Sequence, residues 1–234
     1  CTAPRPEHDP LMTSPALRTV LFDLDGTLLD TAPDLAAALN QVLVENQREA
    51  LPFETIRPWV SHGGPALIGY GFQPEPEHPD FAPLRERLLE IYRANIADQT
   101  RLFPGMAEVL DELEARQLKW GVVTNKPGWL TEPLLEQLDL HARCACIVSG
   151  DTLEERKPHP APLLHACTLT GSQADECLYV GDAQRDIEAG RNAQMKTLVA
   201  LFGYIGEEDR PDEWQADGML EQPADLLEWL VASA

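Results

Sequence analysis

The chain has 234 residues, of which 44% are hydrophobic, enough to bury the core of one ordinary domain plus a smaller second unit. No run of roughly 18 apolar residues occurs and no basic-then-apolar signal opens the chain, so we expect a cytoplasmic protein with no membrane partner. The formal charge of -21 argues against nucleic acid as a partner, because affinity for a phosphate backbone comes from clustered Lys and Arg. An anionic substrate would need local positive charge, from a metal ion or from individually placed lysines.

The first elements in chain order are a leader and a strand. Residues 1–17 are rich in proline and are predicted to form a disordered leader. Residues 18–24, RTVLFDL, form a short apolar run that is typical of a strand buried on both faces.

The next segment, residues 31–103, contains helical patterns and no convincing strand. APDLAAALNQVLVENQ and DFAPLRERLLEIYRANIADQ are both amphipathic with the period of a helix. Pro33 and Pro104 punctuate the chain near the two junctions. We therefore predict a small all-helical insert at 31–103, placed after the first strand of a core made of residues 18–30 and 104–234.

The remainder of the chain alternates between strands and helices. Strands are predicted at 119–126, 144–151, 176–183 and 196–204, and helices at 105–118, 129–140, 161–171 and 186–195. This alternation indicates a doubly wound parallel sheet, a Rossmann-like α/β fold. An insert after the first strand lies above the carboxyl edge of such a sheet, where ligands bind.

Polar residues gather just after the predicted strands, so parallel strands would bring them to one edge. They are Asp23, Asp25, Thr124, Asn125, Lys126, Asp182 and Asp186, joined by Lys157 from a loop before a helix. Three converging carboxylates repel one another unless a cation neutralises them, and oxygen ligands suit Mg²⁺ best. The hydroxyl, amide and lysine groups around them are suitable donors to phosphate oxygens.

The spacing of the first two carboxylates suggests a chemical role. An aspartate can attack phosphorus to form an aspartyl phosphate, and in D-x-D the second carboxylate lies on the same side of an extended chain, where it can handle a proton. Gly26 then allows a tight turn, in which Thr27 offers its hydroxyl and amide.

Four segments together carry a family resemblance. DLDGT, VVTNK, RKPHP and GDAQRD resemble, in order, the four motifs of the haloacid dehalogenase superfamily of phosphatases, and the match spans almost the whole chain. The dehalogenases of that superfamily lack the carboxylate two residues after the nucleophile, whereas Asp25 is present here. The resemblance therefore implies a phosphatase rather than a dehalogenase.

The resemblance implies a role for each motif residue. Asp23 would be the nucleophile, Asp25 the general acid and then base, and Thr124 and Lys157 would hold the phosphoryl oxygens. Mg²⁺ would be bound by Asp23, the backbone carbonyl of Asp25 and Asp182, with Asp186 as an additional ligand. Further substrate contacts are expected from Thr27, Asn125 and Lys126.

The insert resembles the helical cap of the phosphoglycolate phosphatase branch, which closes over a small phosphate monoester. Its loop VSHGG makes Ser61, His62 and Gly63 candidates for contact with the rest of the substrate. The overall pattern is similar to phosphoglycolate phosphatases, whereas this loop and the tail at 202–223 look more like N-acetylmuramate 6-phosphate phosphatases. Both substrates remain open.

Two other functions remain as alternatives. The phosphomutase branch of the superfamily keeps both motif aspartates, and the fold can also serve as a non-catalytic, metal-dependent binding module. Monomer and homodimer are both compatible with the sequence.

Overall fold

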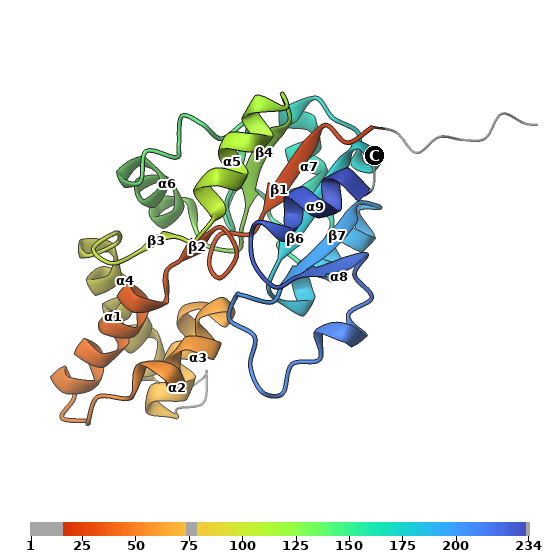
Figure 1. Ribbon diagram of the computed structural model, residues 1–234. Coiled ribbons are helices and arrows are strands. Elements are labelled where there is room, and N and C mark those ends of the chain that lie inside the picture. The colour runs from red at the N-terminus through yellow and green to blue at the C-terminus, as the bar shows by residue number, and fades with distance from the viewer. Residues whose placement is uncertain (1–15, 74–78, 233–234) are drawn as a thin grey trace, which may run out of the picture.

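The computed structural model describes residues 16–73 and 79–232 (Figure 1). Most of the predicted leader, including all of 1–15, lies outside the described residues. No helix in the described ranges is both long enough and apolar enough to cross a membrane.

The core is a six-stranded parallel sheet, which confirms the predicted fold class. Its order is β5-β4-β1-β6-β7-β8. The strands are β1 (Thr19–Phe22), β4 (Lys119–Val123), β5 (Ile147–Val148), β6 (Cys177–Gly181), β7 (Lys196–Ala200) and β8 (Gly218–Leu220). β1, the first strand in the chain, lies in the middle of the sheet, so the motif that follows it is flanked by the loops after β4 and β6.

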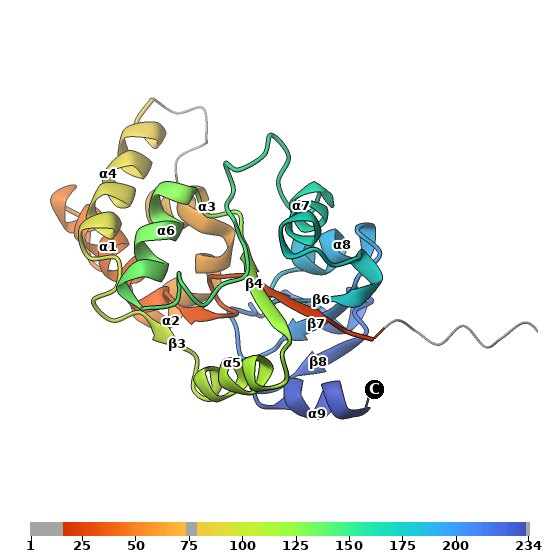
Figure 2. The ribbon, with the colours of Figure 1, turned by 90° about the horizontal axis from the view of Figure 1, so that it is seen from above.

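Helices cover both faces of the sheet, as Figure 2 shows. They are α5 (Met106–Ala115), α6 (Gly128–Gln137), α7 (Ala161–Thr170), α8 (Gln184–Asn192) and α9 (Asp225–Ala232), with short 3₁₀ turns η2 (Ala174–Glu176) and η3 (Pro211–Glu213). Residues of β1 alternate between two cores: Val20 and Phe22 pack with α5 and α9, whereas Leu21 packs with α7 and α8. This period of two is the reason that the buried strands read as continuous apolar runs.

Two features of the sheet differ from the prediction. β8 was not predicted, because it has three residues, begins with Gly218 and follows the polar stretch that ends in Asp217. β5 has only two residues, Ile147 and Val148, although the apolar pattern extends over 144–151. Both are edge strands, which need fewer apolar residues than the central strands.

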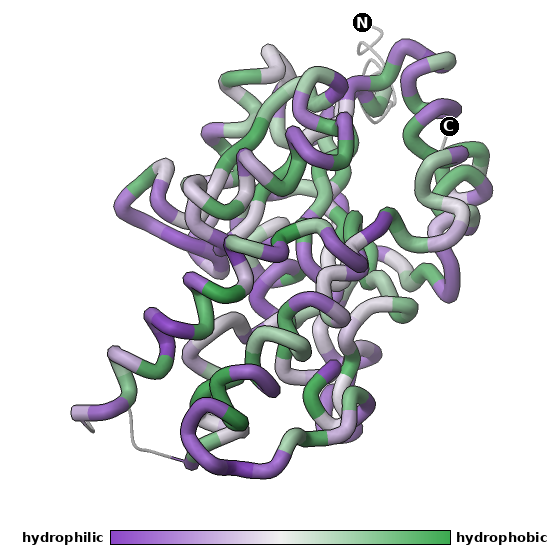
Figure 3. The backbone as a smooth tube through the Cα atoms, turned by 90° about the vertical axis from the view of Figure 1, so that its left-hand side faces the viewer, coloured by the Kyte–Doolittle hydropathy of each residue, from purple (hydrophilic) through white to green (hydrophobic). Residues whose placement is uncertain are grey.

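The helical segment joins the sheet through a short antiparallel pair. β2 (Leu29–Asp30) pairs with β3 (Arg101–Leu102), so the chain leaves and returns at one place. Between them lie α1 (Ala32–Glu45), α2 (Phe53–Ile56), η1 (Arg57–His62), α3 (Gly63–Phe72) and α4 (Phe81–Ala94). Hydrophobic and hydrophilic residues alternate along these helical turns in Figure 3, the pattern of helices buried on one face.

Candidate active site

Three carboxylates meet at the carboxyl edge of the sheet, as their positions after strands led us to expect. Asp23 follows β1, Asp182 follows β6 and Asp186 lies in the first turn of α8. One oxygen of each lies within 4.8 Å of the others, and the side chains are only 3%, 2% and 0% exposed. Such a cluster is unstable without a cation.

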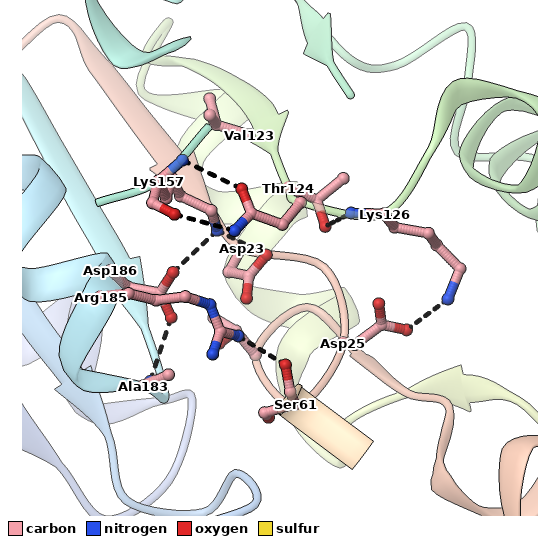
Figure 4. A network of polar contacts seen from close by, with 12 residues as sticks. Asp23, Asp25, Ser61, Val123, Thr124, Lys126, Lys157, Ala183, Arg185 and Asp186 are labelled. Atoms are coloured by element: carbon pink, nitrogen blue, oxygen red, sulfur yellow. Dashed lines mark hydrogen bonds and ion pairs between the residues drawn. The ribbon is translucent and has the colours of Figure 1, made fainter. Parts of the chain in front are cut away.

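Lys157 supplies part of the compensating charge. Its Nζ lies 2.9 Å from Asp23 Oδ1 and 2.8 Å from Asp186 Oδ1 (Figure 4). It also donates a hydrogen bond to the Tyr179 hydroxyl at 2.7 Å. The Tyr179 hydroxyl in turn donates to the Val123 carbonyl at 2.8 Å. The Lys157 ammonium is thus held between the carboxylates of Asp23 and Asp186, and the neutral hydroxyl of Tyr179 fixes its position.

One lysine does not satisfy all three acids. Burial, followed by the charges of Asp23 and Asp186, raises the pKa of Asp182 to about 7. Burial also raises the pKa of Asp186. Asp23 Oδ1 pairs with Lys157 by charge but has no hydrogen-bond partner among the described residues. The donor set of buried carboxylate oxygens, one of them lacking a hydrogen bond, fits a hard divalent cation such as Mg²⁺.

The turn after β1 fits tightly against Asp182. Gly26 adopts φ +84°, and a Cβ at this position would lie 2.1 Å from Asp182 Oδ2. Asp182 Oδ2 accepts hydrogen bonds from Ser61 Oγ at 2.6 Å and from the Tyr204 amide at 2.9 Å, while Thr27 Oγ1 donates to Oδ1 at 3.4 Å. Only glycine allows the backbone to approach this carboxylate so closely.

Asp25 has partners different from those of the other acids. Its Oδ1 accepts hydrogen bonds from Thr31 Oγ1 at 2.6 Å and Lys126 Nζ at 2.8 Å. Burial disfavours the charge of Lys126, but the neighbouring Asp25 outweighs it, so the pKa of Lys126 lies above its usual value. Lys126 Nζ also lies 4.6 Å from the ring centroid of Tyr92 on α4. The side chain of Asp25 is therefore outside the acidic cluster.

Thr124 and Asn125 follow β4 and complete the edge. Thr124 Oγ1 accepts a hydrogen bond from the Lys126 amide at 3.1 Å. Asn125 bonds the backbone of Lys157 in both directions, through Nδ2 to the carbonyl at 3.0 Å and through Oδ1 from the amide at 3.1 Å. Asn125 thus holds the loop that carries Lys157.

The candidate residues of the helical segment lie over this edge. Ser61, His62 and Gly63 line a cavity of about 1000 Å³ together with Asp23 and Asp25. The hydroxyl of Ser61 bonds Asp182 in this conformation. Burial, followed by the charge of Arg185, lowers the pKa of His62.

Sequence reasoning missed three residues of this site. Arg185 Nη2 donates to the Ser61 carbonyl at 2.6 Å and joins α8 to η1 (Figure 4). Tyr204, after β7, donates through its hydroxyl to Asp30 Oδ1 at 2.7 Å and accepts from the Ala32 amide at 2.9 Å. Tyr92 carries a buried hydroxyl without a partner in the described residues. Arg185 lies inside GDAQRD, so its position was a usable signal, whereas the two tyrosines had none.

Comparison with known proteins agrees with this geometry. The model of the family described as haloacid dehalogenase-like hydrolase matches residues 20–200. A phosphoglycolate phosphatase of Xanthomonas campestris pv. campestris (strain 8004) is 46% identical over 215 residues, which cover 90% of this chain and 95% of the relative. An N-acetylmuramic acid 6-phosphate phosphatase of Pseudomonas putida (strain KT2440) is 43% identical over 210 residues, covering 90% and 94%.

A solved structure shows the same fold. The crystal structure of a predicted phosphoglycolate phosphatase from Haemophilus somnus 129PT superposes with a TM-score of 0.81 at 28% identity, covering 93% of this chain and 99% of that one. Family match, relatives and fold agree with the four motifs, and the chain belongs to the haloacid dehalogenase-like hydrolases as a phosphatase.

Proposed function

We propose that the protein is a magnesium-dependent phosphomonoester hydrolase that works through an aspartyl phosphate on Asp23. The observation that carries this proposal is the position of Asp23, buried on the floor of the cavity beside Lys157, with Asp25 lining the same cavity. The nucleophile and the proton carrier thereby line one cavity, and the cation of Lys157 pairs with the nucleophile behind it.

In the first step an Asp23 oxygen attacks phosphorus, and the bond from phosphorus to the leaving oxygen breaks. Asp25 gives that oxygen its proton, so the alcohol leaves neutral. In the second step Asp25 takes a proton from water, whose oxygen attacks phosphorus and breaks the bond to Asp23. Phosphate leaves and both aspartates return to their starting state. Thr124 and Lys157 hold the phosphoryl oxygens.

The acidic cluster of Asp23, Asp182 and Asp186 would hold Mg²⁺, with the backbone carbonyl of Asp25 as a further ligand. When bound, the ion neutralises charge on the carboxylates and on the phosphoryl group, which allows two anions to approach each other. The helical segment 31–103 acts as a cap in this proposal, since its residues Ser61 and Tyr92 close the cavity above Asp23.

For the substrate we propose an amino-sugar phosphate, N-acetylmuramic acid 6-phosphate. The relatives' names divide between this compound and phosphoglycolate. A cavity of about 1000 Å³ has the size of sites for compounds with tens of heavy atoms, which is far more than a two-carbon acid fills. Phosphoglycolate is the second candidate.

The test is phosphate release from both compounds with Mg²⁺, compared by kcat/KM, with Asp23→Asn as the inactive control. A higher value for the amino sugar supports the proposal, and a higher value for 2-phosphoglycolate contradicts the substrate. A sugar phosphate isomer as product would indicate a phosphomutase. Absence of metal-dependent turnover on these and on an aryl phosphate would instead indicate a binding module.

A further inference from the structure

Three arginines line the cavity without a hydrogen bond or ion pair to any residue that the structure describes. Arg85 and Arg93 lie on α4 of the helical segment, and Arg156 precedes Lys157 in the core. Within the described part of the chain none of their guanidinium groups forms a hydrogen bond or ion pair; Arg93 lies 5.4 Å from the ring centroid of Trp129. We call these three residues the arginine rim.

This absence of partners is unusual for the protein. Carboxylates outnumber basic residues by 39 to 18, and the other lysines and arginines of the described ranges, Arg191 excepted, bond a carboxylate, a carbonyl or a hydroxyl. On α4 itself, Arg87 bonds Glu45 and Glu90. The partnerless arginines thus concentrate at the cavity.

Acidic residues on the same walls do not cancel this charge by pairing. Glu90 is bonded to Arg87, and Asp151 accepts a hydrogen bond from the Gly128 amide. Glu86 is the remaining acid of that wall and pairs with none of the three. Three guanidinium groups facing one cavity therefore remain available to an anion, for which their planar donor pattern is well suited.

The rim is separate from the groups that surround phosphorus in the proposed mechanism. Lys157 and Lys126 are engaged with Asp23, Asp186 and Asp25. Beside the rim lie Trp129, which is 41% exposed on α6, and Tyr92, whose buried hydroxyl has no partner in the described ranges. The Tyr92 hydroxyl is too deeply buried to be offered to a ligand, whereas the exposed indole of Trp129, with Arg93 beside it, suits the apolar face of a sugar that carries an acid.

We propose that Arg85, Arg93 and Arg156 bind a second anionic group, a carboxylate on the alcohol part of the phosphate ester. This inference rests on the proposed function and adds the residues that select the substrate. Because Arg85 and Arg93 come from the helical segment and Arg156 from the core, such a carboxylate bridges the two and favours the closed arrangement.

The test uses two sugars that differ in a single substituent, the lactyl ether that carries the carboxylate. N-acetylmuramic acid 6-phosphate and N-acetylglucosamine 6-phosphate share ring and phosphate, and only the former has the lactyl acid. We expect the wild-type enzyme to prefer the acid, and the triple variant Arg85→Gln, Arg93→Gln, Arg156→Gln to lose about 10- to 100-fold in kcat/KM on it alone. The preference should also weaken with added salt.

The matched control is Arg191→Gln, which removes an exposed, partnerless arginine on α8 away from the cavity and should leave both values unchanged. p-Nitrophenyl phosphate reports whether each variant is folded and chemically competent. The proposed role of the arginine rim is overturned if the wild type has equal kcat/KM on the two sugars. It is also overturned if the triple variant loses kcat/KM equally on both. Absence of turnover on the aryl phosphate by the wild type overturns the proposed function instead.

Discussion

At the scale of single residues, the site depends on how closely the turn after β1 approaches Asp182. Glycine is needed at position 26 for two reasons: its φ is positive, and a Cβ would clash with the Asp182 carboxylate. Gly105 has nearly the same φ, +87°, but nothing lies within 4 Å of its Cβ position. An alanine at Gly105 would therefore cost backbone strain alone, whereas an alanine at Gly26 would cost strain and a clash with Asp182.

We expect Gly105→Ala to lower the free energy of unfolding by about 1 kcal/mol, the cost of a left-handed alanine, with little change in activity. Gly26→Ala should lose more stability and at least about 100-fold in kcat/KM, because Asp182 must move. Urea denaturation and phosphate release measure both effects. Equal activity in the two variants would contradict the proposed role of this close approach.

Asp182 also gives the metal-free protein a pH dependence. Its pKa is about 7 in the folded protein against 3.8 for a free carboxyl, so the folded state binds more protons between these values and loses stability as pH rises through them. We expect Asp182→Asn to be more stable than the wild type at pH 8, by roughly 2–4 kcal/mol, and to approach it at pH 4. The measurement is unfolding by urea in EDTA, and an advantage that shrinks with rising pH would refute the assignment.

At the scale of elements, the sequence predicted the central strands and helices well because their patterns repeat. The residues after β1, β4 and β6 could be placed at one edge for the same reason, since parallel strands share their carboxyl ends. Contacts between distant segments could not be predicted. The hydrogen bond from Ser61 to Asp182 spans 121 residues and that from Tyr204 to Asp30 spans 174, and neither leaves a local pattern.

Tyr204 connects the loop after β7 with the start of the helical segment. Burial holds the pKa of its hydroxyl well above the usual value, so it remains a donor to Asp30 while it accepts from the Ala32 amide. Tyr204→Phe should cost about 1–2 kcal/mol of stability, because the buried Ala32 amide and the half-buried Asp30 carboxylate each lose a partner. It should also lower kcat/KM, since the hydroxyl ties the loop after β7 to Asp30 and Ala32, and the backbone amide of the same residue positions Asp182.

The control for this substitution is Tyr70→Phe, since Tyr70 stacks on Trp59 and its hydroxyl has no bond within the described ranges. Denaturation midpoints and kcat/KM compare the two variants. If they behave alike, the hydroxyl of Tyr204 does not support the site.

At the scale of the whole molecule, the net charge of -21 adds to the mutual repulsion of the buried acidic cluster, and a bound cation would relieve it. Binding of Mg²⁺ to the folded state alone stabilises it by RT ln(1 + [Mg²⁺]/Kd), about 2.7 kcal/mol at a hundredfold excess over Kd. We therefore expect Mg²⁺ to raise the melting temperature by roughly 5–10 °C for a chain of this size.

Thermal unfolding in EDTA and in Mg²⁺ measures this shift. Asp182→Asn should reduce it strongly, whereas Glu86→Gln, which removes an exposed carboxylate of the cavity wall outside the cluster, should retain it. An equal shift in both variants would place the ion elsewhere.

The pairing of β2 with β3 has a consequence for how such enzymes diversify. Leu29 faces Leu102 and Asp30 faces Arg101, so the two ends of the helical segment are neighbours. This pair forms a sheet of its own, apart from the six-stranded sheet that carries Asp23, so a different segment with neighbouring ends would leave the larger sheet intact. Arg85 and Arg93 of the arginine rim belong to the segment, whereas Arg156, Asp23 and Lys157 belong to the sheet side. Replacement of the helical segment would therefore change which alcohol part of the phosphate ester is accepted, and the proposed chemistry at phosphorus would stay the same.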